Sequence, residues 1–112
     1  MTNENKYERQ YKLHTVEGVK RFYDDLLTLK EARFFGGDFE LSDMLLDFDS
    51  AVERCLTKRQ KQITELYYLQ GLNSLKISRE LSITHQTILE HLHTAYKNLA
   101  SYHLLERNKY ND

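Results

Sequence analysis

The stretch LTKRQKQITELYYLQGLNSLKISRELSITHQTILEHLHTAYKNL, residues 56–99, has the strongest periodic pattern in this chain of 112 residues. Its apolar residues recur at steps of three and four, which predicts amphipathic helices rather than strands. Thr57 and Gln60 have the spacing of a capping box, so the first of these helices begins at Thr57. Gly71 ends it, because glycine is favoured just past the end of a helix.

Two further helices follow, separated by a short break. Asn73 or Ser74 caps the first of them. Its inward-facing positions are expected to be Leu75, Ile77 and Leu81. Residues 82–84 form the break, and Thr84 caps a longer helix that runs to about Tyr102. The apolar face of this last helix contains Ile88, Leu92, Ala95, Tyr96 and Leu99.

The N-terminal half predicts two more helices. Residues 15–35 have apolar residues at helical spacing, with Thr15 as the N-cap and Gly36-Gly37 as the stop signal. A second helix begins at Ser42, runs to about residue 56 and has an acidic outer side. The sequence has no strand signal and no proline, so we expect an all-α fold of about five helices.

A short helix, a tight turn and a longer helix together make a helix-turn-helix, whose second helix enters the major groove of DNA. Its packing requires a small residue where the two helices cross, and Ser78 has that position. Apolar residues must flank the crossing, anchor the turn and face inward from the second helix. These positions are Ile77, Leu81, Ile83, Ile88 and Leu92. The pattern therefore predicts a C-terminal helix-turn-helix with a long recognition helix.

Residues 56–101 resemble the region 4 helix-turn-helix of bacterial sigma factors, and they are similar to the related domain of LuxR-type regulators. The resemblance rests on Leu56-Thr57-x-Arg59-Gln60, Leu66-Tyr67-Tyr68, Gly71 and the Ile83-Thr84 turn. The acidic, leucine-rich segment upstream resembles small phage and prophage regulators that carry this module near their C-terminus. The resemblance implies a sequence-specific DNA-binding regulator of transcription, in a bacterium or its phage, and not an enzyme.

Two residues depart from the family pattern. Ser82 stands in the turn where family members usually have glycine, which adopts positive φ without strain. His91 occupies a position that is often apolar. We therefore expect a turn that differs slightly, and a core that uses Leu92 or a buried, partnered His91.

The resemblance places four residues in the groove, namely His85, Gln86, Leu89 and Glu90. They open the predicted recognition helix and lie away from its apolar face. Gln86 is able to pair with an adenine edge, and Glu90 can accept a hydrogen bond from cytosine N4. Leu89 stands where the sigma pattern usually has arginine, so it can contact a thymine methyl group but cannot read guanine.

Phosphate contacts are expected from basic and hydroxyl residues around the motif. They are Lys58, Arg59, Lys61, Lys76 and Lys97, with Thr84 and Thr87 at the N-terminal end of the recognition helix. Because the cations are few, counterion release gives a monomer only modest affinity. A homodimer that reads two half-sites would bind more tightly.

Charge divides the chain into an acidic and a basic half. Residues 1–55 have eight Lys and Arg against twelve Asp and Glu, whereas residues 56–112 have eight against five. The basic half suits DNA, and the acidic half does not. The acidic half suits protein contacts instead. The alternative function is therefore a regulator that binds RNA polymerase or a sigma factor.

Other classes of function have little support. His91 and His93 point to different sides of a helix, and no cysteine accompanies them at zinc spacing, so no metal site and no cofactor are expected. The neighbouring carboxylates Asp24-Asp25 and Asp47/Asp49 are expected to be a solvated acidic surface rather than an acid–base pair. The remaining rival is a helical adaptor that does not bind DNA.

The expected organisation has four parts. Residues 1–13 form a mobile N-terminus, residues 14–55 a helical extension for dimer or partner contacts, residues 56–103 the DNA-binding domain, and residues 104–112 a C-terminal tail. No apolar run approaches the roughly 18 residues that span a bilayer, so no membrane partner is expected. The polar N-terminus is no signal peptide, and the lone Cys55 has no disulfide partner, which favours a cytoplasmic location.

Overall fold

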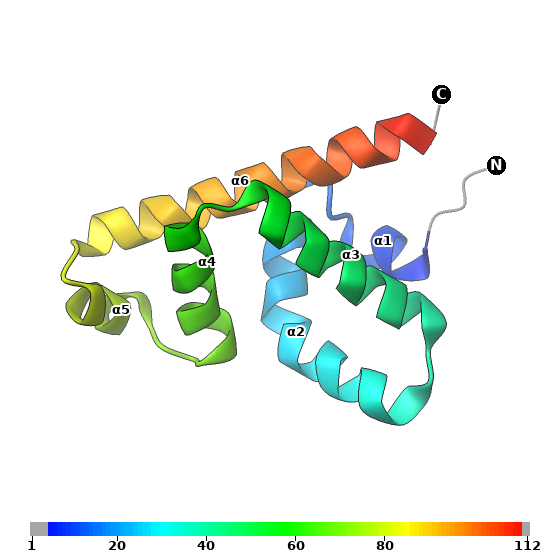
Figure 1. The fold of residues 1–112 in the computed structure, drawn as a ribbon, viewed down its shortest axis with the longest axis horizontal. Coiled ribbons are helices and arrows are strands. Elements are labelled where there is room, and N and C mark those ends of the chain that lie inside the picture. Colours follow the sequence, from blue (N-terminus) through cyan, green and yellow to red (C-terminus); the bar gives the residue numbers. More distant parts are fainter. Residues whose placement is uncertain (1–4, 111–112) are drawn as a thin grey trace.

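The computed structural model describes residues 5–110, and these residues fold into helices with no strand among them (Figure 1). The α-helices are α1 (Lys6–Tyr11), α2 (Val16–Gly36), α3 (Phe39–Cys55), α4 (Lys58–Thr64), α5 (Ser74–Leu81) and α6 (His85–Tyr110). A π-helical segment, η1 (Glu65–Leu69), continues α4. The prediction of an all-α fold is confirmed over the described residues, with six α-helices rather than about five. None of these helices is long and apolar enough to cross a membrane.

Helix α6 is the central helix of the fold. It has 26 residues and is therefore about 39 Å long, in a molecule whose longest dimension is 48 Å. Helices α2, α3, α4 and α5 all pack against it (Figure 1). The largest fully buried side chains are Phe22, Phe48, Leu41, Met44, Leu45, Ile63, Ile77, Ile88, Leu99 and Val19. The two halves of the chain therefore share one hydrophobic core.

Several predicted helix ends are confirmed. Thr15 caps α2 by accepting a hydrogen bond from the backbone N–H of Gly18, and Gly37 ends this helix in the left-handed region at φ 58°. Thr57 and Gln60 form the complete capping box that starts α4. The start of α3 differs from the prediction. Asp38, not Ser42, is its N-cap, because the Asp38 carboxylate accepts from the N–H of Leu41 at 3.2 Å.

The N-terminal segment, expected to be a mobile N-terminus, contains a short helix in the structure. Residues 6–11 form α1, which Asn5 caps, and it packs on α2 and α3. Tyr11 and Leu13 are buried, and the Tyr11 hydroxyl donates to Asp25 at 2.7 Å. The hydroxyl of Tyr7 also donates to Asp38 at 2.5 Å, so both apolar and polar contacts join this segment to α2 and α3. Residues 1–4 lie outside the described part.

The C-terminal end of α6 also differs from the prediction. This helix continues past Tyr102 to Tyr110, because the sequence after Thr84 contains no glycine or proline to stop it. Residues 104–110, expected to form a C-terminal tail, are consequently part of α6, and residues 111–112 lie outside the described part. The extra turns bring His103 onto Phe48 of α3, with the two rings parallel and 6.3 Å apart.

Candidate nucleic-acid interface

Helices α5 and α6 cross at one end of the molecule, where a three-residue turn joins them (Figure 1). Ile77 of α5 and Ile88 of α6 are fully buried at the crossing, and Leu92 is also buried. Leu81 and Ile83 are partly buried against the same core. Ser78 follows Ile77 on α5, and its hydroxyl donates to the backbone carbonyl of Ile83 in the turn. The residues singled out for packing thus hold the two helices at a fixed angle.

The turn between the two helices is tight. Ser82 ends α5 in the left-handed region at φ 55°. The N–H of Ile83 then donates back to the carbonyl of Ser78 at 3.2 Å. A serine in this region is strained, and the buried anchor Ile83 together with these hydrogen bonds holds it there.

Threonines 84 and 87 organise the first turn of α6. Thr84 Oγ1 accepts from the N–H of Thr87 at 3.1 Å and lies 2.8 Å from the Thr87 hydroxyl. The Thr84 hydroxyl therefore caps α6, and the Thr87 hydroxyl is its hydrogen-bond partner. The first N–H groups of a helix have no intrahelical acceptor, so those of His85 and Gln86 remain available to an anion.

The four expected base-reading residues occupy the first two turns of α6. Gln86, Leu89 and Glu90 are exposed, and the exposed fraction of Leu89 is 47%. The Gln86 amide donates to the Glu90 carboxylate at 3.5 Å. His85 is half-buried, and its Nε2 lies 2.7 Å from the hydroxyl of Ser74 at the start of α5.

An exposed polar stripe extends this surface along α6. Residues Gln86, Glu90, His93 and Lys97 follow one another at steps of four, three and four, which places them on one side of the helix. All four are exposed. The structure therefore puts Lys97, expected to contact phosphate, in line with the base-reading residues. His91 is half-buried beside this stripe.

The start of α5 contributes residues that the sequence pattern did not assign correctly. Leu75 was expected to face inward, but its exposed fraction is 53%. Its position two residues before the buried Ile77 places it on the opposite side of α5, and that spacing was visible in the sequence. Leu75 is thus exposed, whereas the half-buried Ser74 contacts His85. The exposed Arg79, in the last turn of α5, is a further cation not assigned before.

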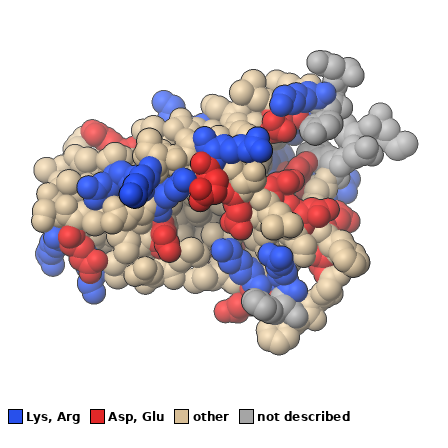
Figure 2. All heavy atoms as spheres, viewed as in Figure 1, with Lys and Arg blue, Asp and Glu red and all other residues tan. Residues whose placement is uncertain are grey.

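The expected phosphate-binding lysines have different surroundings. Lys58, Arg59, Lys76 and Lys97 are exposed. Lys61 is instead paired with Glu53 of α3 at 2.9 Å, and only 31% of its side chain is exposed. Lys and Arg lie over both ends of the molecule, whereas several Asp and Glu gather over α3 (Figure 2). Lys61 is therefore the weakest of the five phosphate candidates.

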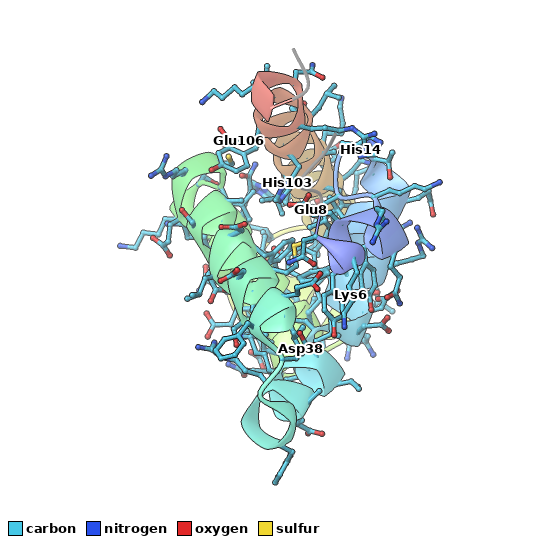
Figure 3. The ribbon with its side chains drawn as sticks, turned by 90° about the vertical axis from the view of Figure 1, so that its right-hand side faces the viewer. Lys6, Glu8, His14, Asp38, His103 and Glu106 are labelled. Carbon is cyan, nitrogen blue, oxygen red and sulfur yellow. The ribbon has the colours of Figure 1, made fainter. Side chains whose placement is uncertain are left out.

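A second group of titratable side chains lies at the other end of α6 (Figure 3). His103 packs between Phe48 and Tyr102, and its Nε2 is buried without a hydrogen-bond partner among the described residues. Burial lowers the pKa of His103 to about 4. Within residues 5–110, no three His, Cys, Asp or Glu side chains are arranged to hold a metal ion.

Comparison with known proteins adds no relative. The chain matches no protein-family model, no curated protein sequence and no solved structure. The assignment of function therefore depends on the geometry of the chain itself.

Proposed function

We propose that this chain is a sequence-specific DNA-binding regulator of transcription. In this proposal α5, the turn at residues 82–84 and α6 act as a helix-turn-helix, and the start of α6 lies in the major groove. The observation that carries the proposal is the arrangement at this end of the molecule. A rigid buried crossing at Ile77, Ser78 and Ile88 supports an exposed polar stripe on the first turns of a long helix.

The stripe has chemistry suited to base edges. The Gln86 amide offers a donor and an acceptor, which is the complement of adenine N7 and N6. Glu90 accepts from cytosine N4, and Leu89 contacts a thymine methyl group. A good bidentate pair such as Gln86 with adenine is worth about 1–3 kcal/mol of discrimination, and the expected target contains an adenine, a cytosine and a thymine at neighbouring positions.

Backbone phosphates would be bound around this stripe. The N–H groups at the start of α6 face one strand, and Lys58, Arg59, Lys76, Arg79 and Lys97 are exposed cations near or along the same unit. Five cations release few counterions, so affinity falls less steeply with salt than for strongly basic regulators. A homodimer on a symmetric site would supply the missing affinity.

The resemblance to sigma factor region 4 agrees with this reading. It rests on the capping box at Thr57, on Gly71 and on the turn at Ile83-Thr84, all of which have structural roles in this fold. Leu89, where the sigma pattern usually has arginine, indicates a target that differs from a standard promoter element.

Selection of fragments from genomic DNA at moderate salt tests the proposal. We expect the chain to enrich a short motif, whose symmetry reveals whether it binds as a monomer or as a dimer. The variant Gln86→Ala/Glu90→Ala should fold normally and fail to enrich that motif. Random recovery by the wild-type chain would contradict DNA recognition and favour the helical adaptor.

A second candidate function is binding to RNA polymerase or to a sigma factor. It is favoured by the exposed carboxylates of α3, which suit a basic protein surface and not DNA. Copurification of polymerase with a chain that enriches no DNA motif would support this candidate over the first.

A further inference from the structure

Helix α3 presents an exposed stripe that no other part of the described chain covers. It consists of Phe39, Asp43, Leu46, Asp47 and Glu53, which we call the α3 outer face. Their spacing of four, three, one and six residues keeps them on one side of a helix. The exposed fraction is 85% for Phe39 and 55% for Leu46. Two large apolar side chains therefore lie in water between carboxylates.

The charge of this face is poorly compensated. Helix α3 contains five carboxylates and one arginine. At the C-terminal end of the face, Lys61 pairs with Glu53 and the exposed Arg54 lies on the same side of α3, but the neighbours of Asp47 are Asp43 and Glu106. Partial burial, together with these two like charges, raises the pKa of Asp47. Acidic side chains accordingly gather over α3 in Figure 2, and Glu106 of α6 lies beside α3 in Figure 3.

The combination of charge and apolar surface restricts the occupant. Nucleic acid and anionic lipid are repelled by a cluster of carboxylates. Exposed aromatic side chains such as Phe39 are enriched in the apolar core of protein interfaces, which a polar rim surrounds. A basic protein segment with its own apolar residues satisfies both features.

We propose that the α3 outer face docks a basic amphipathic helix of a partner protein. Apolar residues of that helix cover Phe39 and Leu46, and its Lys or Arg side chains pair with Asp43 and Asp47. The proposed site is on a different helix from the DNA-reading stripe. A single chain is thus able to hold DNA and a protein partner together, but the docking itself does not depend on DNA binding.

Titration of the isotope-labelled full chain with two helical probe peptides tests this proposal by NMR. Both peptides have 17 residues, the length of α3, and carry the same lysines. One has leucines along the opposite side and the other has alanines. We expect the leucine peptide to shift amide signals of residues 39–53, and to bind at least about ten-fold more tightly than the alanine peptide.

Variants separate the apolar from the charged contribution. Phe39→Ser/Leu46→Ser should lower affinity for the leucine peptide to that for the alanine peptide. Asp43→Asn/Asp47→Asn should weaken both peptides, and both pairs lie on the surface, so the fold should persist. Leu105→Ser replaces an exposed leucine of α6 outside the α3 outer face, so it is the matched control and should bind both peptides as the wild type does.

Three results would overturn the proposal. The first is equal affinity for the two peptides, which would mean non-specific attraction of a polycation. The second is a set of shifted signals that leaves residues 39–53 unchanged. The third is binding of the chain to anionic vesicles that Phe39→Ser/Leu46→Ser abolishes, which would assign the face to a lipid surface. Failure of DNA selection would leave these measurements unaffected, so the two proposals fail separately.

Discussion

The hydroxyl of Ser74 lies 2.7 Å from Nε2 of His85, and this hydrogen bond joins the first residue of α5 to the first residue of α6. It orients the His85 imidazole at the entrance of the proposed reading surface. A side chain that is already positioned loses less conformational entropy on binding than a free one. The bond is therefore expected to matter for DNA affinity more than for folding.

Replacement of this serine tests that expectation. Ser74→Ala should weaken binding to the selected DNA by about five-fold, because a typical hydrogen bond contributes roughly 1 kcal/mol. Fluorescence anisotropy with a labelled duplex measures the affinity. Ser101→Ala, a serine on the exposed side of α6, is the control and should bind as the wild type does. Unchanged affinity of Ser74→Ala would show that the orientation of His85 is irrelevant.

Gly18 marks the close approach of the N-terminal segment to α2. A Cβ atom added there would lie 2.0 Å from the backbone oxygen of Tyr11. Gly18→Ala should therefore lower the free energy of unfolding by at least about 2 kcal/mol, measured by urea denaturation. At Gly36 an added Cβ meets nothing within 4 Å, so Gly36→Ala should be neutral or stabilising by up to about 1 kcal/mol. Equal stability of the two variants would mean that α1 is not docked as described.

At Ser82 we expect a replacement to raise the free energy of unfolding, whereas Gly18→Ala lowers it. The φ of 55° at Ser82 is unfavourable for serine and unstrained for glycine. Ser82→Gly should therefore raise the free energy of unfolding by roughly 0.5–1 kcal/mol, despite the greater entropy of the unfolded chain. Ser101→Gly, within α6, should lower it by about 1 kcal/mol. A destabilised Ser82→Gly variant would contradict the left-handed turn.

The buried His103 predicts loss of stability in acid. Burial lowers its pKa to about 4 in the folded state, whereas the unfolded value is about 6.5. The unfolded chain therefore binds the proton first, and stability falls as pH drops from about 6.5 to about 4, by at most about 3 kcal/mol. His14 and Glu106 are the charged neighbours that modulate this pKa.

Replacing His103 with a ring that does not titrate separates its contribution to acid sensitivity from that of the other titratable groups. His103→Phe keeps an aromatic ring beside Phe48, so it should retain more of its stability at pH 4.5 than the wild type does. The exposed His93 provides the control, and His93→Gln should keep the acid sensitivity of the wild type. Identical pH profiles for His103→Phe and the wild type would mean that the imidazole is not buried.

Local signals in the sequence predict most of the helices correctly. Thr15, Gly37 and the Thr57–Gln60 capping box act through their nearest neighbours, so their effects are visible without the fold. The order of α1 depends instead on burial of Tyr11 and Leu13 by helices distant in sequence. The continuation of α6 to Tyr110 depends on the absence of a breaker, which is a weaker signal than the presence of one.

The candidate site was predicted less completely than the fold. The exposure of Gln86, Leu89 and Glu90 follows from their spacing relative to Ile88, so periodicity was sufficient. The bond from Ser74 to His85 and the pairing of Lys61 with Glu53 join separate elements. Such contacts between helices depend on their packing angle, which the spacing of residues does not reveal.

The affinity of the chain for its selected DNA motif, compared between wild type and Gln86→Ala/Glu90→Ala, tests the central claim most directly. Because Gln86 and Glu90 bond to each other, the double replacement leaves no unpaired partner. We predict at least about ten-fold weaker binding to the motif and unchanged binding to unrelated DNA, whereas Lys76→Ala should weaken both equally. Equal affinity of the double variant and the wild type for the motif would contradict the placement of α6 in the major groove.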